Sequence, residues 1–261
     1  MSKIDSLESY LVSLQEYEGK TVIFRGLDKP FKKLSTVVRS FCSCSQIDHG
    51  CDDLENIDSW YDDWNNNRKA NSGLIDTFKK YEKTLFDSFK RQARIYLEKH
   101  PTNDWEWLAY AQHYGLRTRF FDWSKNPLAA LYFSISNQTN KSDVWVYIYD
   151  FGNLTEGHQN MIDLNAPPSE SPLDYTGELN RFIPPVIDNR MATQQSVFTI
   201  QEDPFEVIKD DNIKELVIER DKKESIRKQL HRIGINQVSL FPNLDGLCEN
   251  LTWVWEQYRG A

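Results

Sequence analysis

The segment from Trp105 to Ile135, WEWLAYAQHYGLRTRFFDWSKNPLAALYFSI, constrains the fold more than any other part of the chain. Its first apolar residues recur at spacings of three and four, which predicts a helix that ends at Gly115. A short strand is expected at Phe120–Phe121. The apolar run that begins at Pro127 predicts a buried helix, with the Ser124 hydroxyl as its cap.

The same segment places polar side chains among its apolar residues. A charge beside a buried apolar run must be paired or used, because an isolated buried charge is costly. The segment is therefore the candidate functional site. Its polar members are Gln112, His113, Arg119, Asp122 and Ser124.

The rest of the chain mixes helical and strand patterns without a repeat or a low-complexity linker. Apolar periodicity predicts helices at residues 4–14, 74–97 and 221–233, and a last helix that carries Leu247, Leu251, Val254 and Trp255 on one side. β-Branched and aromatic runs predict strands at 21–24, 144–149, 196–200 and 213–218, with Arg25 delivered at the end of the first. A polar insertion is expected at 51–73 and a long irregular connection at 152–189. One α+β domain over residues 1–261 is the simplest interpretation.

Composition excludes several classes of protein. The net charge is −8 and no long basic block occurs, which argues against nonspecific binding to nucleic acid or anionic membrane. No apolar run has the length of a membrane span and no signal-peptide core precedes the first helix, so a cytoplasmic protein is expected. Cys42, Cys44, His49 and Cys51 form the one cluster with metal-ligand chemistry, but their spacing is not that of a paired zinc motif. Free thiols and no metal are expected.

Three stretches carry a family resemblance. QHYGLRTRFFDWSKNPLAALYFS, from Gln112 to Ser134, resembles the signature of the FRG domain family, which is named for a Phe-Arg-Gly tripeptide present here as Phe24-Arg25-Gly26. RMATQQSVF at 190–198 and GINQVSLFPNLDGL at 234–247 resemble further parts of it, so the resemblance covers roughly residues 20–255. The chain departs from the family at Arg117, usually proline, and at Ser196, usually glycine.

The FRG tripeptide in turn is similar to the first-strand motif of the ADP-ribosyltransferase superfamily, which binds the nicotinamide ribose of NAD. The resemblance implies a small split sheet flanked by helices. It also implies NAD as substrate for ADP-ribosyl transfer or NAD cleavage, in a bacterial toxin or antiviral defence protein. The acceptor would be a nucleic acid or another protein, and an antitoxin or regulatory protein would be a further partner. The superfamily's third motif carries a catalytic glutamate, where this chain has Gln194 and Gln195.

These implications assign roles to particular residues. The expected catalytic residues are Arg25, His113, Asp122 and Gln194, and the expected NAD-binding residues are Phe24, Arg25, Gly26, Tyr114, Arg119, Trp123, Ser124 and Gln195. The guanidinium of Arg25 offers donors in a fixed fork, and Gly26 would let a ligand approach the backbone. Asp122 or Glu202 would supply the missing carboxylate. We expect Arg25, Asp122 and Gln194 to share one pocket, and Asp122 to be ionised and held by Arg25 or Arg119.

Each residue also has a structural interpretation. Arg25 could be a core arginine paired with Asp122, and His113 could cap a helix or bond a carbonyl. The aromatic residues could belong to the core, and the glutamines could bond the backbone across strands. The corresponding alternative function is a catalytically silent module that binds a nucleotide or a protein. A nuclease is disfavoured because paired carboxylates at metal spacing are absent from the sequence.

Overall fold

The structure is a computed structural model that describes residues 2–30, 35–38, 72–137, 139–153, 161–162, 171–177, 179–186, 188–206, 208 and 211–259. Its helices are α1 (Leu7–Ser13), α4 (Ser72–Ala93), α5 (Asp104–His113), α6 (Pro127–Ile135), α7 (Asn189–Gln194), α8 (Lys223–Arg232), α9 (Gln237–Leu240) and α10 (Leu244–Arg259). Its strands are β1 (Ser2–Ile4), β2 (Lys20–Leu27), β3 (Phe121–Ser124), β4 (Val144–Asn153), β5 (Met161–Ile162), β6 (Asn180–Phe182), β7 (Ser196–Ile200) and β8 (Ile213–Ile218). Short 3-10 turns lie at Gln15–Tyr17, Arg94–Tyr96 and Pro172–Asp174.

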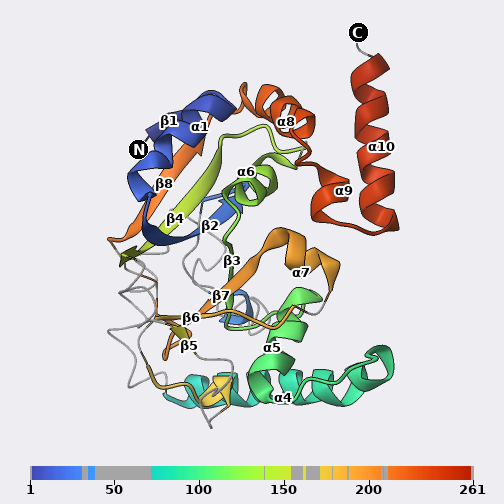
Figure 1. Cartoon of the computed structure of the whole chain (residues 1–261). Coiled ribbons are helices and arrows are strands. Elements are labelled where there is room, and N and C mark those ends of the chain that lie inside the picture. The colour runs from blue at the N-terminus through green and yellow to red at the C-terminus, as the bar shows by residue number, and fades with distance from the viewer. Residues whose placement is uncertain are drawn as a thin grey trace.

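The described strands form one mixed sheet of eight strands in the order β1-β8-β4-β2-β3-β7-β6-β5. Two groups of four strands make up this sheet. They meet between β2 and β3, where Phe24 and Ser124 form a single register pair. By contrast, β2 pairs with β4 in antiparallel fashion along most of its length. The α+β domain expected from the sequence is confirmed (Figure 1). Among the described strands, the central neighbours β2 and β3 share the fewest register pairs.

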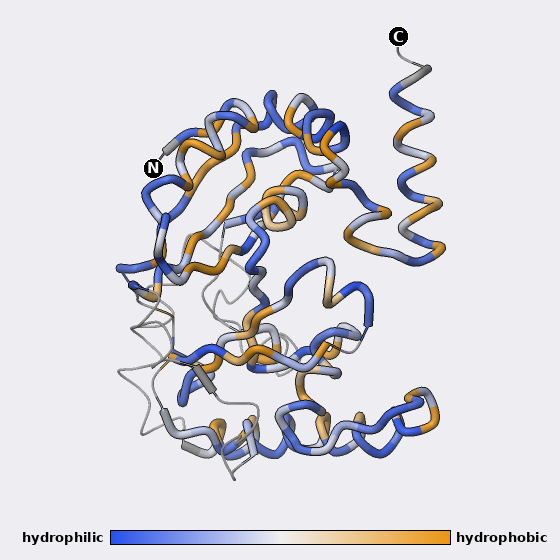
Figure 2. The backbone as a smooth tube through the Cα atoms, viewed as in Figure 1, coloured by the Kyte–Doolittle hydropathy of each residue, from blue (hydrophilic) through white to orange (hydrophobic). Residues whose placement is uncertain are grey.

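Helices cover the two halves of the sheet separately. On the first half, α6 packs with α1 and α8 over buried residues of β4 and β8 such as Val146 and Leu216. On the second half, α5 packs over β6 and β7 through Trp105 and Phe198. Figure 2 shows apolar stretches along the strands and along α6, whose residues share a buried cluster with residues of α1 and α8. The gap between α6 and α5 therefore lies over the junction of the two halves (Figure 1).

Most expected elements are confirmed, and the strands at Ser196–Ile200 and Ile213–Ile218 have the predicted bounds. Gly115 has a φ of +88° at the end of α5, as a helix-terminating glycine requires. Two details were wrong at helix ends. Ile4 belongs to β1, where it pairs with β8 and is buried, so packing overrides its helical spacing. The predicted long helix ends at Ala93, which leaves Ile95 83% exposed.

Two predicted caps were also wrong. Asn126, and not Ser124, caps α6 by accepting hydrogen bonds from the backbone of Leu128 and Ala129. The Ser124 hydroxyl is instead committed to the Gln194 carbonyl. At α8 the N-cap residue is Lys222 in place of the expected Asp221, and no side chain caps this helix. Local sequence preferences do not determine which of several nearby polar residues reaches a helix end.

Some predictions concern segments outside the described residues. The Cys42–Cys51 cluster lies there, as does the expected insertion up to residue 71, whereas residues 72 and 73 begin α4. Strand β2 extends to Leu27, so Arg25 lies within the strand opposite Tyr147 and not at its end. Among the described helices, none combines the length and apolarity needed to cross a bilayer.

Candidate functional site

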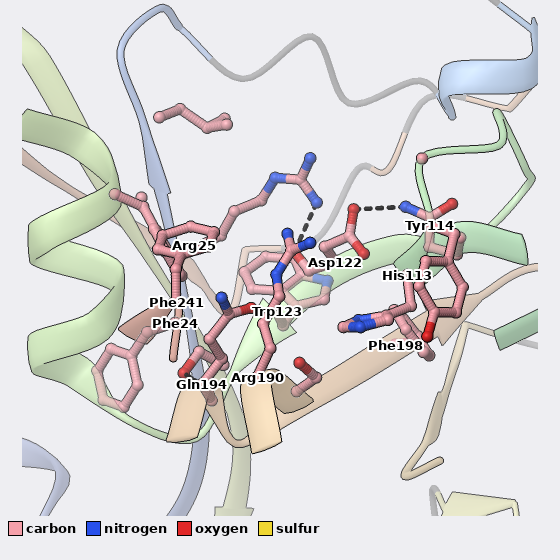
Figure 3. Close-up of a pocket in the computed structure, with 17 residues that line it drawn as sticks. Phe24, Arg25, His113, Tyr114, Asp122, Trp123, Arg190, Gln194, Phe198 and Phe241 are labelled. Atoms are coloured by element: carbon pink, nitrogen blue, oxygen red, sulfur yellow. Dashed lines mark hydrogen bonds between the residues drawn. The ribbon is translucent and has the colours of Figure 1, made fainter. Parts of the chain in front are cut away.

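A pocket of about 540 Å³ lies at the junction of the two halves of the sheet, within the size range of ligand sites. β2, β3, the end of α5, α6, α7, β7 and the residue after α9 all contribute to it. Its lining residues are Phe24, Arg25, Gly26, Leu27, Gln112, His113, Tyr114, Gly115, Asp122, Trp123, Ser124, Phe133, Arg190, Gln194, Ser196, Phe198 and Phe241 (Figure 3). The expected convergence of Arg25, Asp122 and Gln194 on one pocket is confirmed.

Arg25 reaches across the junction from β2 to β3. Its Nη1 donates a hydrogen bond of 2.6 Å to the main-chain carbonyl oxygen of Asp122 (Figure 3). Beyond the Phe24–Ser124 pair the two strands share no further register pair, so the guanidinium bridges strands that the backbone leaves apart. The rest of the guanidinium borders the pocket.

Gly26 has a different role from the one expected. A Cβ at this position would lie 1.7 Å from the carbonyl oxygen of Ala130, far inside van der Waals contact. The glycine therefore allows α6 to pack closely on β2. On the side where a Cβ would point, α6 fills the space, so the expectation that Gly26 opens the backbone to a ligand is wrong there. Gly26 nevertheless borders the pocket.

Asp122 presents its carboxylate to the pocket. Asp122 is exposed, whereas its neighbours Phe121 and Trp123 are buried. Oδ2 accepts a hydrogen bond of 2.5 Å from Nε2 of Gln112, whose own Oε1 accepts one from the Thr118 hydroxyl. Desolvation raises the pKa of Asp122, against the lowering influence of Arg25 and of the Gln112 hydrogen bond. The expectation that charge would outweigh desolvation was wrong, because the effect of desolvation exceeds the lowering by Arg25 and by the Gln112 hydrogen bond.

His113 is joined to the opposite wall of the pocket. Its Nε2 lies 2.7 Å from Oδ2 of Asp188, and its side chain is only 5% exposed. Asp188 also caps α7 by accepting a hydrogen bond from the backbone of Met191. Burial works against ionisation of Asp188, but the hydrogen bonds from Met191 and His113 outweigh it, so its pKa is lowered. The histidine thereby fixes the start of α7, the helix that carries Arg190 and Gln194.

Arg190 is a pocket residue that the sequence interpretation did not assign to the site. Its side chain points into the pocket between Gln194 and Asp122 (Figure 3), and its guanidinium lies 5.0 Å from the centre of the Phe241 ring. Its buried Nε has no hydrogen-bond partner within the described part of the chain. The signal was available, since Arg190 opens one of the stretches that resemble the FRG family.

The comparison with the third motif had implied that Gln194 lies on a strand. It is instead the last residue of α7. The side-chain Nε2 of Gln194 donates to the carbonyl oxygen of Leu240 at 3.0 Å. The main-chain carbonyl oxygen of Gln194 accepts a hydrogen bond from the Ser124 hydroxyl at 2.6 Å. Gln195, expected to bind NAD, follows with a left-handed φ of 48° and does not line the pocket. Its carbonyl accepts a hydrogen bond from the backbone of Lys125. The alternative that a glutamine bonds the backbone is thus observed for Gln194.

Arg119 was expected to bind NAD and lies elsewhere. Its Nε and Nη2 donate to the two carboxylate oxygens of Glu82 at 2.9 and 2.6 Å, and both side chains are almost fully buried. This two-pronged pair fastens α4 to the segment that precedes β3. Arg119 is therefore a core residue, and the expectations that it lines the site or holds Asp122 were wrong.

The aromatic lining residues divide into two kinds. Phe24 and Trp123 are 4% and 3% exposed and belong to the core as well as to the pocket wall, and the Trp123 indole donates to Thr199. Tyr114 is 60% exposed at the mouth of the pocket. Glu202 does not line the pocket. Within the described ranges, no group of three or more His, Cys, Asp and Glu side chains could hold a metal ion.

The fold and this pocket define an α+β domain with a ligand-sized site at the junction of its two half-sheets. The family model of the FRG domain matches residues 20–143, which span the Phe24-Arg25-Gly26 strand and β3. The chain thus contains an FRG domain. Arg190 and Gln194 lie beyond the matched residues and complete the pocket from the second part of the chain. No curated protein and no solved structure matches the chain.

Proposed function

We propose that the pocket binds NAD and that the protein transfers ADP-ribose from it or cleaves it. One observation carries the proposal. The Phe24-Arg25-Gly26 strand resembles the first motif of ADP-ribosyltransferases, and the strand-then-helix unit FFDWSKNPLAALYFS is similar to the second motif of that superfamily. Residues of both stretches come together on a single pocket of ligand size. The toxin or phage-defence setting, with a macromolecular acceptor and a neutralising partner protein, rests on the same resemblance.

The chemistry of the pocket wall suits a dinucleotide. Arg25 and Arg190 approach from different elements and offer planar guanidinium groups, which bind phosphate and ribose oxygens through paired hydrogen bonds. Phe241 and Tyr114 offer faces on which a nicotinamide or adenine ring could stack. The Phe241 face is also occupied by Arg190, so a ligand that draws the guanidinium away would free the ring.

Asp122 is the residue we assign to the chemical step. In that step the bond between ribose C1′ and the nicotinamide nitrogen breaks, and its electron pair leaves with nicotinamide. Positive charge develops on C1′ and the ring oxygen until water or an acceptor nucleophile adds and gives up its proton. Among the described lining residues Asp122 is the one carboxylate, and an ionised carboxylate beside the sugar stabilises that charge.

A second candidate is a module that binds a nucleotide without cleaving it. Two observations favour it: the residue that matches the catalytic glutamate is Gln194, and its amide is bonded to the Leu240 carbonyl. A glutamine can hydrogen-bond a ribose hydroxyl, but it contributes little to a developing positive charge.

Incubation of the pure protein with NAD, with and without a cell extract as a source of acceptor, tests both candidates. Nicotinamide release above a blank, with transfer of labelled ADP-ribose where an acceptor is present, supports the enzyme. Saturable NAD binding without release supports the silent module. If nicotinamide is not released and calorimetry detects no NAD binding, both candidates are ruled out.

A further inference from the structure

A second pocket, of about 500 Å³, lies between the end of α6, the connection to β4 and the first turn of α8. It shares no residue with the first pocket. Its basic lining residues are Lys141, Arg220, Lys223 and Arg227. Figure 1 shows α8 packed at the outer end of α6, on the half of the sheet that contains β4 and β8.

Two of these basic side chains are buried. Lys223 and Arg227 are 8% and 9% exposed, one helical turn apart on α8. Nζ of Lys223 donates to the carbonyl oxygen of Asn140 at 2.8 Å, and no carboxylate of the described residues lies within ion-pair distance of it. Burying a charge is unfavourable unless the group is paired or neutralised, and burial lowers the pKa of Lys223. An anion in the pocket would supply the missing counter-charge.

Arg227 is fixed in place by neutral groups as well. Its Nη1 donates to the carbonyl oxygen of Ser136 at 3.3 Å, and its guanidinium lies 4.7 Å from the centre of the Trp253 ring. The pocket therefore contains one cation held in place by stacking and one by a carbonyl.

Asp221 and Glu224 also line this pocket, and each is paired with a neighbouring lysine. Asp221 lies 3.5 Å from Lys222, and Glu224 lies 3.5 Å from Lys228. Two further carboxylates influence Lys223 from a distance. Asp143 accepts a hydrogen bond from the backbone of Arg220, and Asp28 accepts one from the side chain of Asn137.

The start of α8 adds to the positive potential. This ten-residue helix has Lys222 at its N-cap and no side chain that accepts a hydrogen bond from its first turn. A helix N-terminus carries partial positive charge and free backbone donors, which favour an anion. The uncapped first turn and the buried Lys223 border the same pocket.

We propose that this pocket is a binding site for the phosphate group of a small phosphorylated ligand. Lys223, Arg220 and the first turn of α8 bind the phosphate oxygens. Lys141 lies at the exposed rim and screens the remaining charge. The site is independent of the proposed NAD chemistry, because it contains none of the residues of the first pocket.

Calorimetric titration at low ionic strength tests the proposal with three probes: inorganic phosphate, adenosine monophosphate and a short single-stranded oligonucleotide. We expect phosphate and the monophosphate to bind. Lys223→Gln should weaken binding about tenfold or more, since a charge-assisted hydrogen bond is lost. Arg220→Gln should weaken it less; Arg220 is exposed, so this variant leaves the fold intact if Lys223→Gln does not fold. Binding should also weaken as the pH rises and Lys223 loses its proton.

Two controls locate the binding. Arg232→Gln removes an exposed charge from the other end of α8, and Arg190→Gln removes a cation from the first pocket. Arg232→Gln should bind phosphate as the parent does. Arg190→Gln should lose only what the first pocket contributes and keep the binding that Lys223→Gln and Arg220→Gln weaken. The proposal is overturned if neither phosphate nor the monophosphate binds, or if Arg190→Gln abolishes binding that Arg220→Gln and Lys223→Gln leave unchanged. Binding of the oligonucleotide alone would indicate a nucleic-acid surface and would also overturn the small-ligand assignment.

Discussion

Arg25 binds Asp122 through the aspartate's main-chain carbonyl oxygen, at 2.6 Å, which leaves the carboxylate facing the pocket. The arginine therefore positions β3 beside β2, while the aspartate side chain takes its hydrogen bond from Gln112. Structural and functional interpretations of this arginine thus apply together. It joins two strands and also borders the pocket.

Arg25→Lys should weaken NAD binding and turnover about tenfold or more. Lysine keeps the charge, but without a planar guanidinium it cannot bond the Asp122 carbonyl and a ligand at the same time. The melting temperature should fall only modestly, because the variant loses one hydrogen bond between β2 and β3. Calorimetry and nicotinamide release measure the first effect, and thermal unfolding measures the second. A large drop in melting temperature with ligand binding intact would instead mark Arg25 as purely structural.

Asp122→Asn should reduce nicotinamide release by about 100-fold or more while NAD still binds. The fold should be as stable as the parent at neutral pH, or more so. Desolvation raises the pKa of Asp122 in the folded state, so its contribution to stability is full below the unfolded pKa and is lost as the pH rises through the folded value. The asparagine variant should lack this pH dependence. Melting curves from about pH 4 to pH 8 test the sign, and a less stable variant at neutral pH would show it to be wrong.

Glu82→Gln and Arg119→Gln should each destabilise the protein by about 3–5 kcal/mol, since each leaves the other charge buried without its partner. The double variant should recover part of that loss in a double-mutant cycle measured by denaturant unfolding. Lys83→Gln is the matched control. It breaks an exposed pair with Asp87 at 3.1 Å on the same helix and should cost under about 1 kcal/mol. Strictly additive losses in the double variant would contradict the pairing.

Asp188→Ala should lower the free energy of unfolding by about 1 kcal/mol, because α7 loses its N-cap. It should also weaken NAD binding, because Arg190 and Gln194 belong to that helix. Asp188→Asn keeps a capping side chain and isolates the contribution of the charge beside His113. Since the pKa of Asp188 is lowered, the difference between the parent and this variant should be present above the unfolded pKa and disappear as the pH falls through the folded value. Equal stability of the alanine and asparagine variants would contradict the cap.

Periodicity predicted the elements from Trp105 to Ile135 because each depends on local spacing and on glycine or proline at its ends. The pairing of charges was less accessible. Glu82 is 37 positions from Arg119, and nothing in the sequence distinguishes it from the other acids of α4. The single register pair between β2 and β3 likewise depends on how two separate groups of strands pack.

Arg190 and Gln194 were harder to place, for a different physical reason. The stretch RMATQQSVF combines a helix of six residues with a strand, and a left-handed residue, Gln195, separates them. A short helix of this kind shows no full apolar period. Its position is fixed from outside, by the Asp188 cap and by the bond from Gln194 to the Leu240 carbonyl.

The single register pair between β2 and β3 has a mechanical consequence. The strands within each half of the sheet are paired by their own backbone ladders, whereas β2 is joined to β3 by the Phe24–Ser124 register pair and the Arg25 hydrogen bond. This junction is consequently where the sheet resists torsion least. A molecule that contacts both halves would restrict their relative motion. Amide hydrogens that flank the junction would then exchange more slowly with deuterium.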